Sequence, residues 1–322
     1  MSDFNQHQTR SLVERIAATI DAEKRQITNR ELLSLCGAEG IKSVATDPHL
    51  CHEIAETALN QLVRDRYGKI LLDSADPSAC CSEVLKPLQN GLPTQSWRSS
   101  TQICYQQFST PASIAYLGAF LLNLNADDVV LEPSCGTGSL AVWAQAAGAT
   151  VLTNEIDPRR RELSKLLGFN PTELDAEFID DLLTENDVPN VIFANPPFSS
   201  TGGRVEQNHK KFGFRHVESA LRRLERGGRF AIILGESGSP RNASGRKFWQ
   251  SLLPDIRLRA SIELPGREYY RNGTTVGVTL LLGSKLSSRE SQETRSVEEP
   301  IRISASTVEV AFNQALAGEL RF

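Results

Sequence analysis

A polar amide followed by two prolines interrupts an apolar run in the middle of the chain, at Asn195-Pro196-Pro197-Phe198. The side-chain oxygen of Asn195 and the carbonyl oxygen of Pro196 are both hydrogen-bond acceptors. Together they can hold both hydrogens of an amino group out of the plane of a purine ring, so that the amine lone pair becomes available for attack. Phe198 offers a face on which the flat ring stacks. These residues predict chemistry at an exocyclic amine.

The element that must position this loop is the apolar run at residues 191–194. Its β-branched and aromatic residues suit a strand covered on both faces, and proline ends a strand because it lacks an N–H group and fixes φ. Residues that precede a proline are restricted to extended conformations, so Asn195 and Pro196 have little backbone freedom. A preorganised catalytic loop fits these properties, and so does an ordinary turn. The neighbouring motifs decide between the two.

A glycine turn follows an earlier apolar run. Residues 129–131 lead into Glu132-Pro133-Ser134-Cys135-Gly136-Thr137-Gly138, and an alanine-rich helix is expected next. A strand, a glycine turn and a helix open the nucleotide-binding unit of a doubly wound α/β fold. The spacing differs from Gly-x-Gly-x-x-Gly, which argues against a dinucleotide. Cys135 is interpreted as a small packed residue of the turn and not as a nucleophile.

Acidic residues follow the next expected strands. Glu155 ends the strand predicted at residues 150–154, a position from which a carboxylate accepts hydrogen bonds from ribose hydroxyls. A further carboxylate, either Asp175 or Asp181, is expected at the end of a third strand. Either one could accept a hydrogen bond from an adenine amino group. The sequence leaves these two alternatives open.

Charge is unevenly distributed along the chain, although the net charge is only −4. Residues 201–250 hold eleven Lys or Arg against four Asp or Glu, whereas residues 151–200 hold four against ten. The positive segment begins just after the loop at Asn195 and predicts contacts with a phosphate backbone. The favoured residues are Lys210, Lys211 and Arg215. A solvated helix face is the competing interpretation for Arg222, Arg223 and Arg226.

Composition indicates a globular protein, with 40% hydrophobic and 23% charged residues in a chain of 322. No apolar run approaches the roughly 20 residues that a membrane span needs, and the N-terminus lacks a signal pattern. We therefore expect a cytoplasmic protein without membrane contact. The six cysteines show no metal-ligand spacing, so reduced thiols and no metal site are predicted.

The flanking regions are predicted from periodicity and composition. Helical spacing over residues 8–86 indicates a small bundle, interpreted as simple core, and residues 87–100 have the composition of a linker. Ser109 or Thr110 is expected to cap a helix that begins with Pro111. A strand pair at 260–265 and 274–282 is bridged by residues 266–273. A flexible tether from residue 284 is expected to precede a short strand and helix at 300–322.

Four motifs, in this order, resemble those of the amino-group DNA methyltransferases, chiefly the adenine-N6 branch. They are Phe108-Ser109-Thr110-Pro111, the turn from Glu132 to Gly138, Glu155-Ile156-Asp157, and Asn195 to Phe198. The resemblance spans about residues 102–283. Residues 174–177 and Tyr269-x-x-x-Gly273-Thr274 are most similar to the methylase part of strawberry-notch-like proteins of bacteria and mobile elements, without their helicase part.

This resemblance implies a class I methyltransferase (Rossmann-like) fold in residues 101–283, preceded by the helical region 1–100 and followed by residues 284–322. The implied fold is a seven-stranded sheet with helices on both faces and a reversed hairpin at its edge. S-adenosylmethionine is the implied methyl donor, and DNA is the implied partner. A flipped adenine would take the methyl group directly on N6, without a covalent enzyme intermediate.

The resemblance also assigns roles to individual residues. Asn195, Pro196, Pro197 and Phe198 form the implied catalytic loop, and Tyr269 is expected to pack on the extruded base beside Phe198. Asp175 would hold the cofactor adenine, with Asp181 as the alternative. The implied cofactor contacts are completed by Phe108, Thr110, Pro111, Glu132, Pro133, Ser134, Cys135, Gly136, Gly138, Glu155, Ile156 and Asn195.

Other functions fit the same residues. Similar loops serve RNA adenines and protein glutamine amides, and a third alternative is a cofactor- or DNA-binding module without catalysis. The positive segment favours nucleic acid over protein, and the intact loop favours catalysis. Because no segment resembles a large target-recognition domain, sequence specificity is unassigned, as is the oligomeric state.

Overall fold

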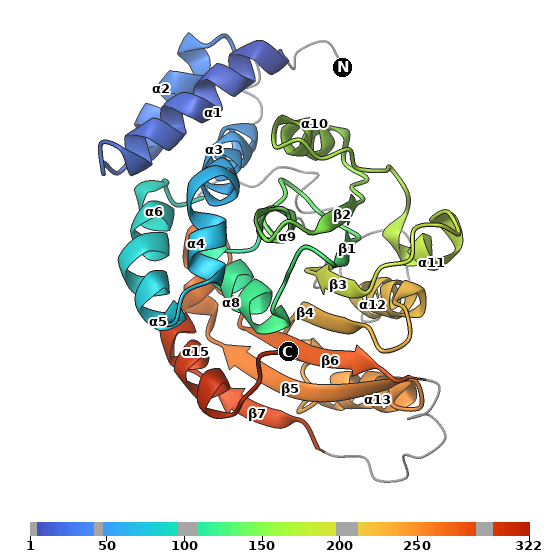
Figure 1. Cartoon of the computed structure of the whole chain (residues 1–322). Coiled ribbons are helices and arrows are strands. Elements are labelled where there is room, and N and C mark those ends of the chain that lie inside the picture. Colours follow the sequence, from blue (N-terminus) through green and yellow to red (C-terminus); the bar gives the residue numbers. More distant parts are fainter. Residues whose placement is uncertain (1–4, 42–47, 96–107, 198–211, 288–298) are drawn as a thin grey trace.

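A seven-stranded sheet forms the centre of the computed structural model, which describes residues 5–41, 48–95, 108–197, 212–287 and 299–322 (Figure 1). The strand order is β2-β1-β3-β4-β6-β5-β7. Neighbours from β2 to β4 are parallel, and β6 runs antiparallel between β4 and β5. The strands are β1 Val129–Glu132, β2 Thr150–Thr153, β3 Val191–Ala194, β4 Arg229–Gly235, β5 Ile256–Leu264, β6 Val278–Lys285 and β7 Ile301–Ser304.

The sheet differs from the expected one at both ends. The reversed hairpin of β5 and β6 is not at the edge, because β7 pairs in parallel with β5 outside it. Beyond β2, the expected third strand is reduced to one parallel bridge between Asn154 and Thr172. The carboxyl ends of β1, β2, β3 and β4 still meet at one edge of the sheet, as parallel pairing requires.

Helices surround the sheet and also form most of the N-terminal region (Figure 1). The predicted linker from residue 87 is partly wrong, because Lys86–Gly91 is helical. Short 3₁₀ turns cover Ala176–Phe178, Glu236–Gly238 and Gly266–Asn272, and π-helical turns cover Val63–Tyr67 and Cys81–Leu85. The helices are α1 Gln6–Asp21, α2 Asn29–Ala38, α3 His49–Leu62, α4 Gly68–Leu72, α5 Pro77–Cys80, α6 Lys86–Gly91, α8 Ala112–Leu122, α9 Ala141–Ala146, α10 Pro158–Leu166, α11 Ile179–Leu182, α12 Phe212–Arg223, α13 Ala243–Leu252 and α15 Val308–Ala317.

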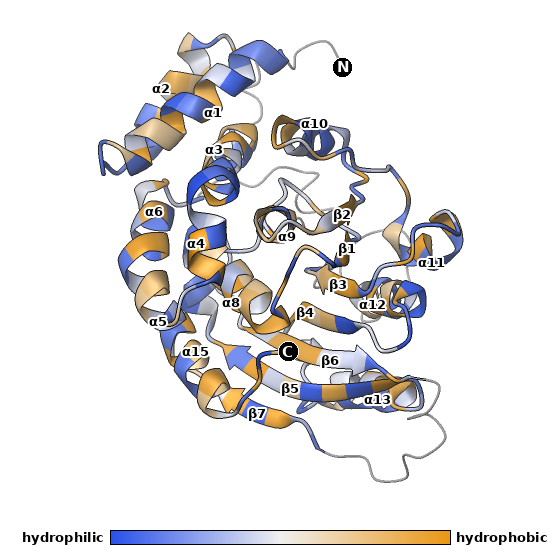
Figure 2. Ribbon diagram, in the orientation of Figure 1, coloured by the Kyte–Doolittle hydropathy of each residue, from blue (hydrophilic) through white to orange (hydrophobic). Residues whose placement is uncertain are grey.

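Alternate residues of the central strand enter two separate apolar cores, because successive side chains of a strand point to opposite faces. Val191 and Phe193 belong to the core that contains α8, α9 and α15. Ile192 and Ala194 belong to the core beneath α12 and α13. In Figure 2, β3 and β4 are largely orange, whereas α1 alternates between blue and orange. The predicted strand, covered on both faces, is confirmed.

The N-terminal helices share the first of these cores with the sheet. Leu12 of α1 and Ile54 of α3 are fully buried in it, and the Tyr116 hydroxyl of α8 donates to the Leu71 carbonyl at 2.7 Å. Thr28 caps α2, since its side chain accepts from the Glu31 N–H. The domain limits at residues 100 and 284 stay predictions. Among the described helices, none is long and apolar enough to cross a membrane.

Candidate active site

Asn195 lies at the carboxyl end of β3, where the two prolines end the strand. Its Nδ2 donates to Thr110 Oγ1 at 2.7 Å and to the Phe108 carbonyl at 3.3 Å. Both amide hydrogens are therefore used, and this fixes the direction of Oδ1. That oxygen is buried, and no donor in the described part of the chain hydrogen-bonds to it. Phe198, which is predicted to stack on the target base, lies outside the described residues.

The segment before α8 orients this amide but does not cap the helix as expected. Pro111 itself occupies the N-cap position, and no side chain caps the helix. Ser109 and Thr110 instead bond to distant partners: Ser109 Oγ donates to Glu56 Oε2 at 2.6 Å, and Thr110 accepts from Asn195. The cap prediction is wrong because both hydroxyls form hydrogen bonds with residues far away in the sequence and not with the start of α8.

The glycine turn has the backbone that its sequence predicts. Gly136 has a φ of 55° and Gly138 a φ of 91°, a left-handed region that favours glycine. The Cys135 N–H donates to the Asn154 carbonyl at 2.8 Å, which joins the turn to the end of β2. Burial raises the pKa of the Cys135 thiol well above its usual range. A protonated, buried thiol agrees with packing and not with nucleophilic attack.

Glu155 connects the glycine turn to α10. Its Oε2 accepts from the Gly136 N–H at 2.7 Å, and its Oε1 accepts from the Asp157 N–H at 2.8 Å. Burial raises the pKa of Glu155, and the positive charge of Arg160 opposes this rise. Burial also raises the pKa of Glu132 well above its usual value. Within the described ranges, Oε2 of Glu132 has no hydrogen-bond partner.

Asn154 holds the segment before Asp175 at the edge of the sheet where the carboxyl ends of the parallel strands meet. Its Nδ2 donates to the Leu174 carbonyl at 3.0 Å and to the Pro133 carbonyl at 2.9 Å, and its Oδ1 accepts from the Leu174 N–H at 2.8 Å. Asp175 caps the turn that follows. Asp181 is exposed within α11. Neither carboxylate ends a strand, so that expectation is wrong.

Tyr269 has a different place from the one that the resemblance implies. It lies in the turn between β5 and β6, is fully buried, and has no ring face exposed to a base. Burial raises its pKa, and the nearby side chains of Thr110 and Asn195 oppose the rise. The hydroxyl therefore lies beside the amide of Asn195. The base-stacking role of Tyr269 stays a prediction, and in this structure its ring is buried.

We expect Tyr269→Phe to lower the rate of methyl transfer while leaving cofactor affinity unchanged. The substitution keeps the buried ring but removes the hydroxyl beside Asn195, and one neutral hydrogen bond contributes about 0.5–1.5 kcal/mol. That range corresponds to a loss of about 2- to 12-fold in kcat. Single-turnover kinetics and calorimetric binding would measure the two quantities. The exposed neighbour supplies the control, since Tyr270→Phe should leave both unchanged.

Arg215 is the one predicted phosphate contact that lies within the described residues. It is on α12, is half-exposed, and pairs with Glu177 at 3.3 Å. Gly213 allows α12 to approach the loop that follows β3, because a Cβ there would lie 2.5 Å from the Pro197 carbonyl oxygen. Lys210 and Lys211 lie outside the described ranges. Arg222 pairs with Glu218 and Asp180, as expected for a solvated helix face.

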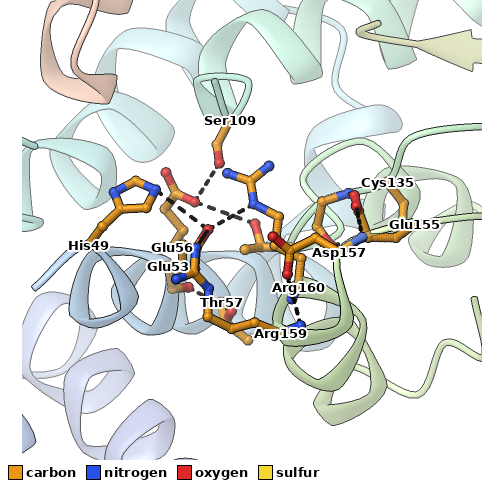
Figure 3. A network of polar contacts seen from close by, with 12 residues as sticks. His49, Glu53, Glu56, Thr57, Ser109, Cys135, Glu155, Asp157, Arg159 and Arg160 are labelled. Carbon is orange, nitrogen blue, oxygen red and sulfur yellow. Dashed lines mark hydrogen bonds and ion pairs between the residues drawn. The ribbon is translucent and has the colours of Figure 1, made fainter. Parts of the chain in front are cut away.

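Sequence reasoning missed the contribution of α3, shown in Figure 3. Glu53 accepts from Arg159 and Arg160, and Asn60 Nδ2 donates to the Thr137 carbonyl of the glycine turn at 3.1 Å. Glu56 accepts from Ser109. A signal was present, since polar residues at positions 49, 53, 56 and 60 fall on one face of a helix that is almost entirely buried.

Comparisons with known proteins identify the fold. No protein-family model matches the chain. A class I S-adenosylmethionine-dependent methyltransferase structure from Listeria monocytogenes superposes with a TM-score of 0.56, at 14% identity over 98% of both chains. A type I restriction-modification methyltransferase subunit from Streptococcus thermophilus gives a TM-score of 0.50, at 17% identity over 97% of this chain and 86% of the other. The chain has the class I methyltransferase fold, which confirms the predicted fold class.

A curated relative covers a smaller part of the sequence. The type II restriction enzyme and methyltransferase RM.BcgI of Heyndrickxia coagulans is 26% identical over an alignment of 163 residues, which covers 43% of this chain. The match covers 25% of the relative, so the chain spans about a quarter of that protein's length.

Proposed function

We propose that the protein is a DNA methyltransferase that transfers a methyl group from S-adenosylmethionine to the N6 amino group of a flipped adenine. The observation that carries the proposal is the Oδ1 atom of Asn195 at the end of β3, which is buried and accepts no hydrogen bond from the described residues. Its direction is fixed by Thr110 and Phe108. With the Pro196 carbonyl, it would accept the two amine hydrogens and leave the nitrogen lone pair free for direct attack. Pro197 stiffens the loop, and Phe198 would stack on the base.

The described residues fit S-adenosylmethionine, which supplies an electrophilic methyl group on a sulfonium. The left-handed glycine turn leaves room for close approach of a ligand, and the buried Glu132 Oε2 is an acceptor without a partner in the described structure. Glu155, with Ile156 beside it, would accept from the ribose hydroxyls. We favour Asp175 over Asp181 for the adenine, because Asn154 ties Asp175's neighbour Leu174 to the strand-end edge. The remaining contacts are Phe108, Thr110, Pro111, Pro133, Ser134, Cys135, Gly136 and Gly138.

DNA as substrate is supported by the positive segment that follows the loop, with Lys210, Lys211 and Arg215 as the proposed phosphate contacts. It is also supported by the restriction-modification proteins that the chain resembles. We propose a cytoplasmic location. The similarity to strawberry-notch-like methylases rests on motif details alone and stays a proposal. The comparisons found restriction-modification methyltransferases instead.

Transfer of tritium from labelled S-adenosylmethionine tests the function. We expect label on DNA, released as N6-methyladenine after digestion, and none on RNA or protein. Label on RNA adenines or on protein glutamine would show that RNA or protein, and not DNA, is the substrate. Cofactor binding without transfer to any of the three would leave a binding module and contradict catalysis.

A further inference from the structure

Three segments far apart in the sequence meet at the carboxylate of Glu56. Its Oε2 accepts from Ser109 Oγ at 2.6 Å and from Thr137 Oγ1 at 3.5 Å, and its Oε1 accepts from Gln95 Nε2. Ser109 belongs to the segment that orients Asn195, and Thr137 lies within the glycine turn. Glu56 is only 8% exposed. It also lines a pocket together with Asn60, Thr110 and Ser139. The N-terminal helix α3 therefore places an acidic group between two proposed cofactor-binding segments.

A positive group lies next to it over the same turn. The Nη1 atom of Arg160 is 3.2 Å from the position that a Cβ would occupy on Gly136. Glu53, one helical turn before Glu56, holds this side chain, because its Oε1 accepts from Arg160 Nε at 2.8 Å. Figure 3 shows Glu53 and Glu56 reaching from α3 toward Arg160 and Ser109. Arg160 is 4% exposed, so its charge is largely shielded from water.

We propose that α3, together with Arg160 of α10, completes the cofactor site by binding the charged amino-acid end of S-adenosylmethionine, with Glu56 receiving the α-ammonium and Arg160 the α-carboxylate. This inference rests on the proposed function, which supplies the ligand. An α-amino acid carries both charges on one carbon, and the structure offers an anion and a cation side by side above the glycine turn. A nucleotide without the amino acid would use neither charge. The pair would thus determine specificity for the amino-acid part.

The electrostatic environment of Glu56 is consistent with binding of a cation. Burial raises the pKa of Glu56, and the Ser109 hydrogen bond and the charge of Arg160 oppose the rise. A ligand ammonium beside the carboxylate would favour its charged form. Charge-assisted hydrogen bonds in a buried site are stronger than neutral ones. The amino-acid end should therefore contribute a large share of the affinity.

Calorimetric titration of Glu56→Gln with two ligands tests the inference. S-adenosylhomocysteine carries the amino acid, whereas 5′-methylthioadenosine shares the nucleoside and thioether but lacks it. Gln preserves the size of the side chain and one acceptor oxygen, but it removes the charge and replaces the second acceptor by an NH2 donor. We expect the Kd of S-adenosylhomocysteine to rise about 10- to 150-fold, because hydrogen bonds to charged groups contribute about 1.5–3 kcal/mol. The Kd of 5′-methylthioadenosine should not change.

The control is Thr57→Val, a change of similar shape on the same buried helix. The Thr57 hydroxyl donates to the Glu53 carbonyl within α3, so this variant should bind both ligands like the wild type. Equal weakening of both ligands by Glu56→Gln would show that Glu56 only supports the fold and would overturn the inference. Unchanged binding of both would overturn it as well. If the wild type binds neither ligand, the proposed function itself is wrong.

Discussion

Replacing Asn195 by Ala should lower the rate of methyl transfer by about 10²- to 10³-fold, the loss typical of removing one preorganised hydrogen-bond partner from a transition state. The substitution removes Oδ1, the buried acceptor that would hold one hydrogen of the target amine. Cofactor affinity should be retained, since the proposed cofactor contacts lie mainly on the glycine turn and beyond β2. Single-turnover transfer on a methylatable DNA, with calorimetric cofactor binding in parallel, would measure both quantities.

An exposed asparagine provides the matched control. Asn186→Ala, in the loop before β3, should methylate at the wild-type rate. A 2-aminopurine at the target position would report base flipping, because its fluorescence rises when the base leaves the stack. We expect that rise to persist in Asn195→Ala with cofactor and to be weaker or altered in Phe198→Ala. Wild-type rates in Asn195→Ala would show that the loop is only a turn.

Glu53→Gln should lower the free energy of unfolding by about 3–5 kcal/mol, because removing one partner of a buried ion pair leaves the other charge uncompensated. Glu53 is fully buried and pairs with Arg160 at 2.8 Å and Arg159 at 2.7 Å. Urea unfolding at pH 7 would measure the loss. For comparison, Glu39→Gln removes the partner of Arg15 in a pair that is partly exposed. Such a pair contributes about 0–1 kcal/mol, so this variant should be nearly neutral.

A second substitution separates charge from packing. Arg160→Met added to Glu53→Gln should recover part of the lost stability, since the buried positive charge is then gone. No recovery would indicate that the loss does not arise from an unpaired Arg160, whose charge Glu155 and Glu56 also face.

The pH dependence of stability should follow from the same ion pairs. Burial alone would raise the pKa of Glu53, but Arg160, His49 and Arg159 hold it well below its ordinary value of 4.5. A carboxyl group with a depressed folded-state pKa stabilises the protein above its unfolded-state pKa and loses this contribution as pH falls. Wild-type stability should therefore decrease below about pH 4.5, and more steeply than that of Glu53→Gln. Parallel slopes in urea titrations from pH 6 to pH 3 would contradict this.

The sequence by itself determined the features that depend on local backbone chemistry. Proline at positions 196 and 197 ends β3 at Asn195, and the glycines at 136 and 138 take φ values that other residues rarely adopt. An apolar run at residues 191–194 predicted a strand buried on both faces. These short-range rules, with the order of the motifs, were enough for the fold class and for the residues at the strand ends.

Only the tertiary structure decided which distant groups share the site. Arg160 and Glu53 are 107 residues apart in sequence, and Ser109 and Glu56 are 53 apart. The resemblance to known enzymes predicted that Tyr269 packs on the target base. In the structure its ring is buried and its hydroxyl lies beside Asn195. The expected cap at Ser109 or Thr110 does not form, because these hydroxyls hydrogen-bond to the distant residues Glu56 and Asn195. Local propensity cannot predict such contacts, because a buried polar group binds whichever complementary group the packing of remote helices brings within hydrogen-bond distance.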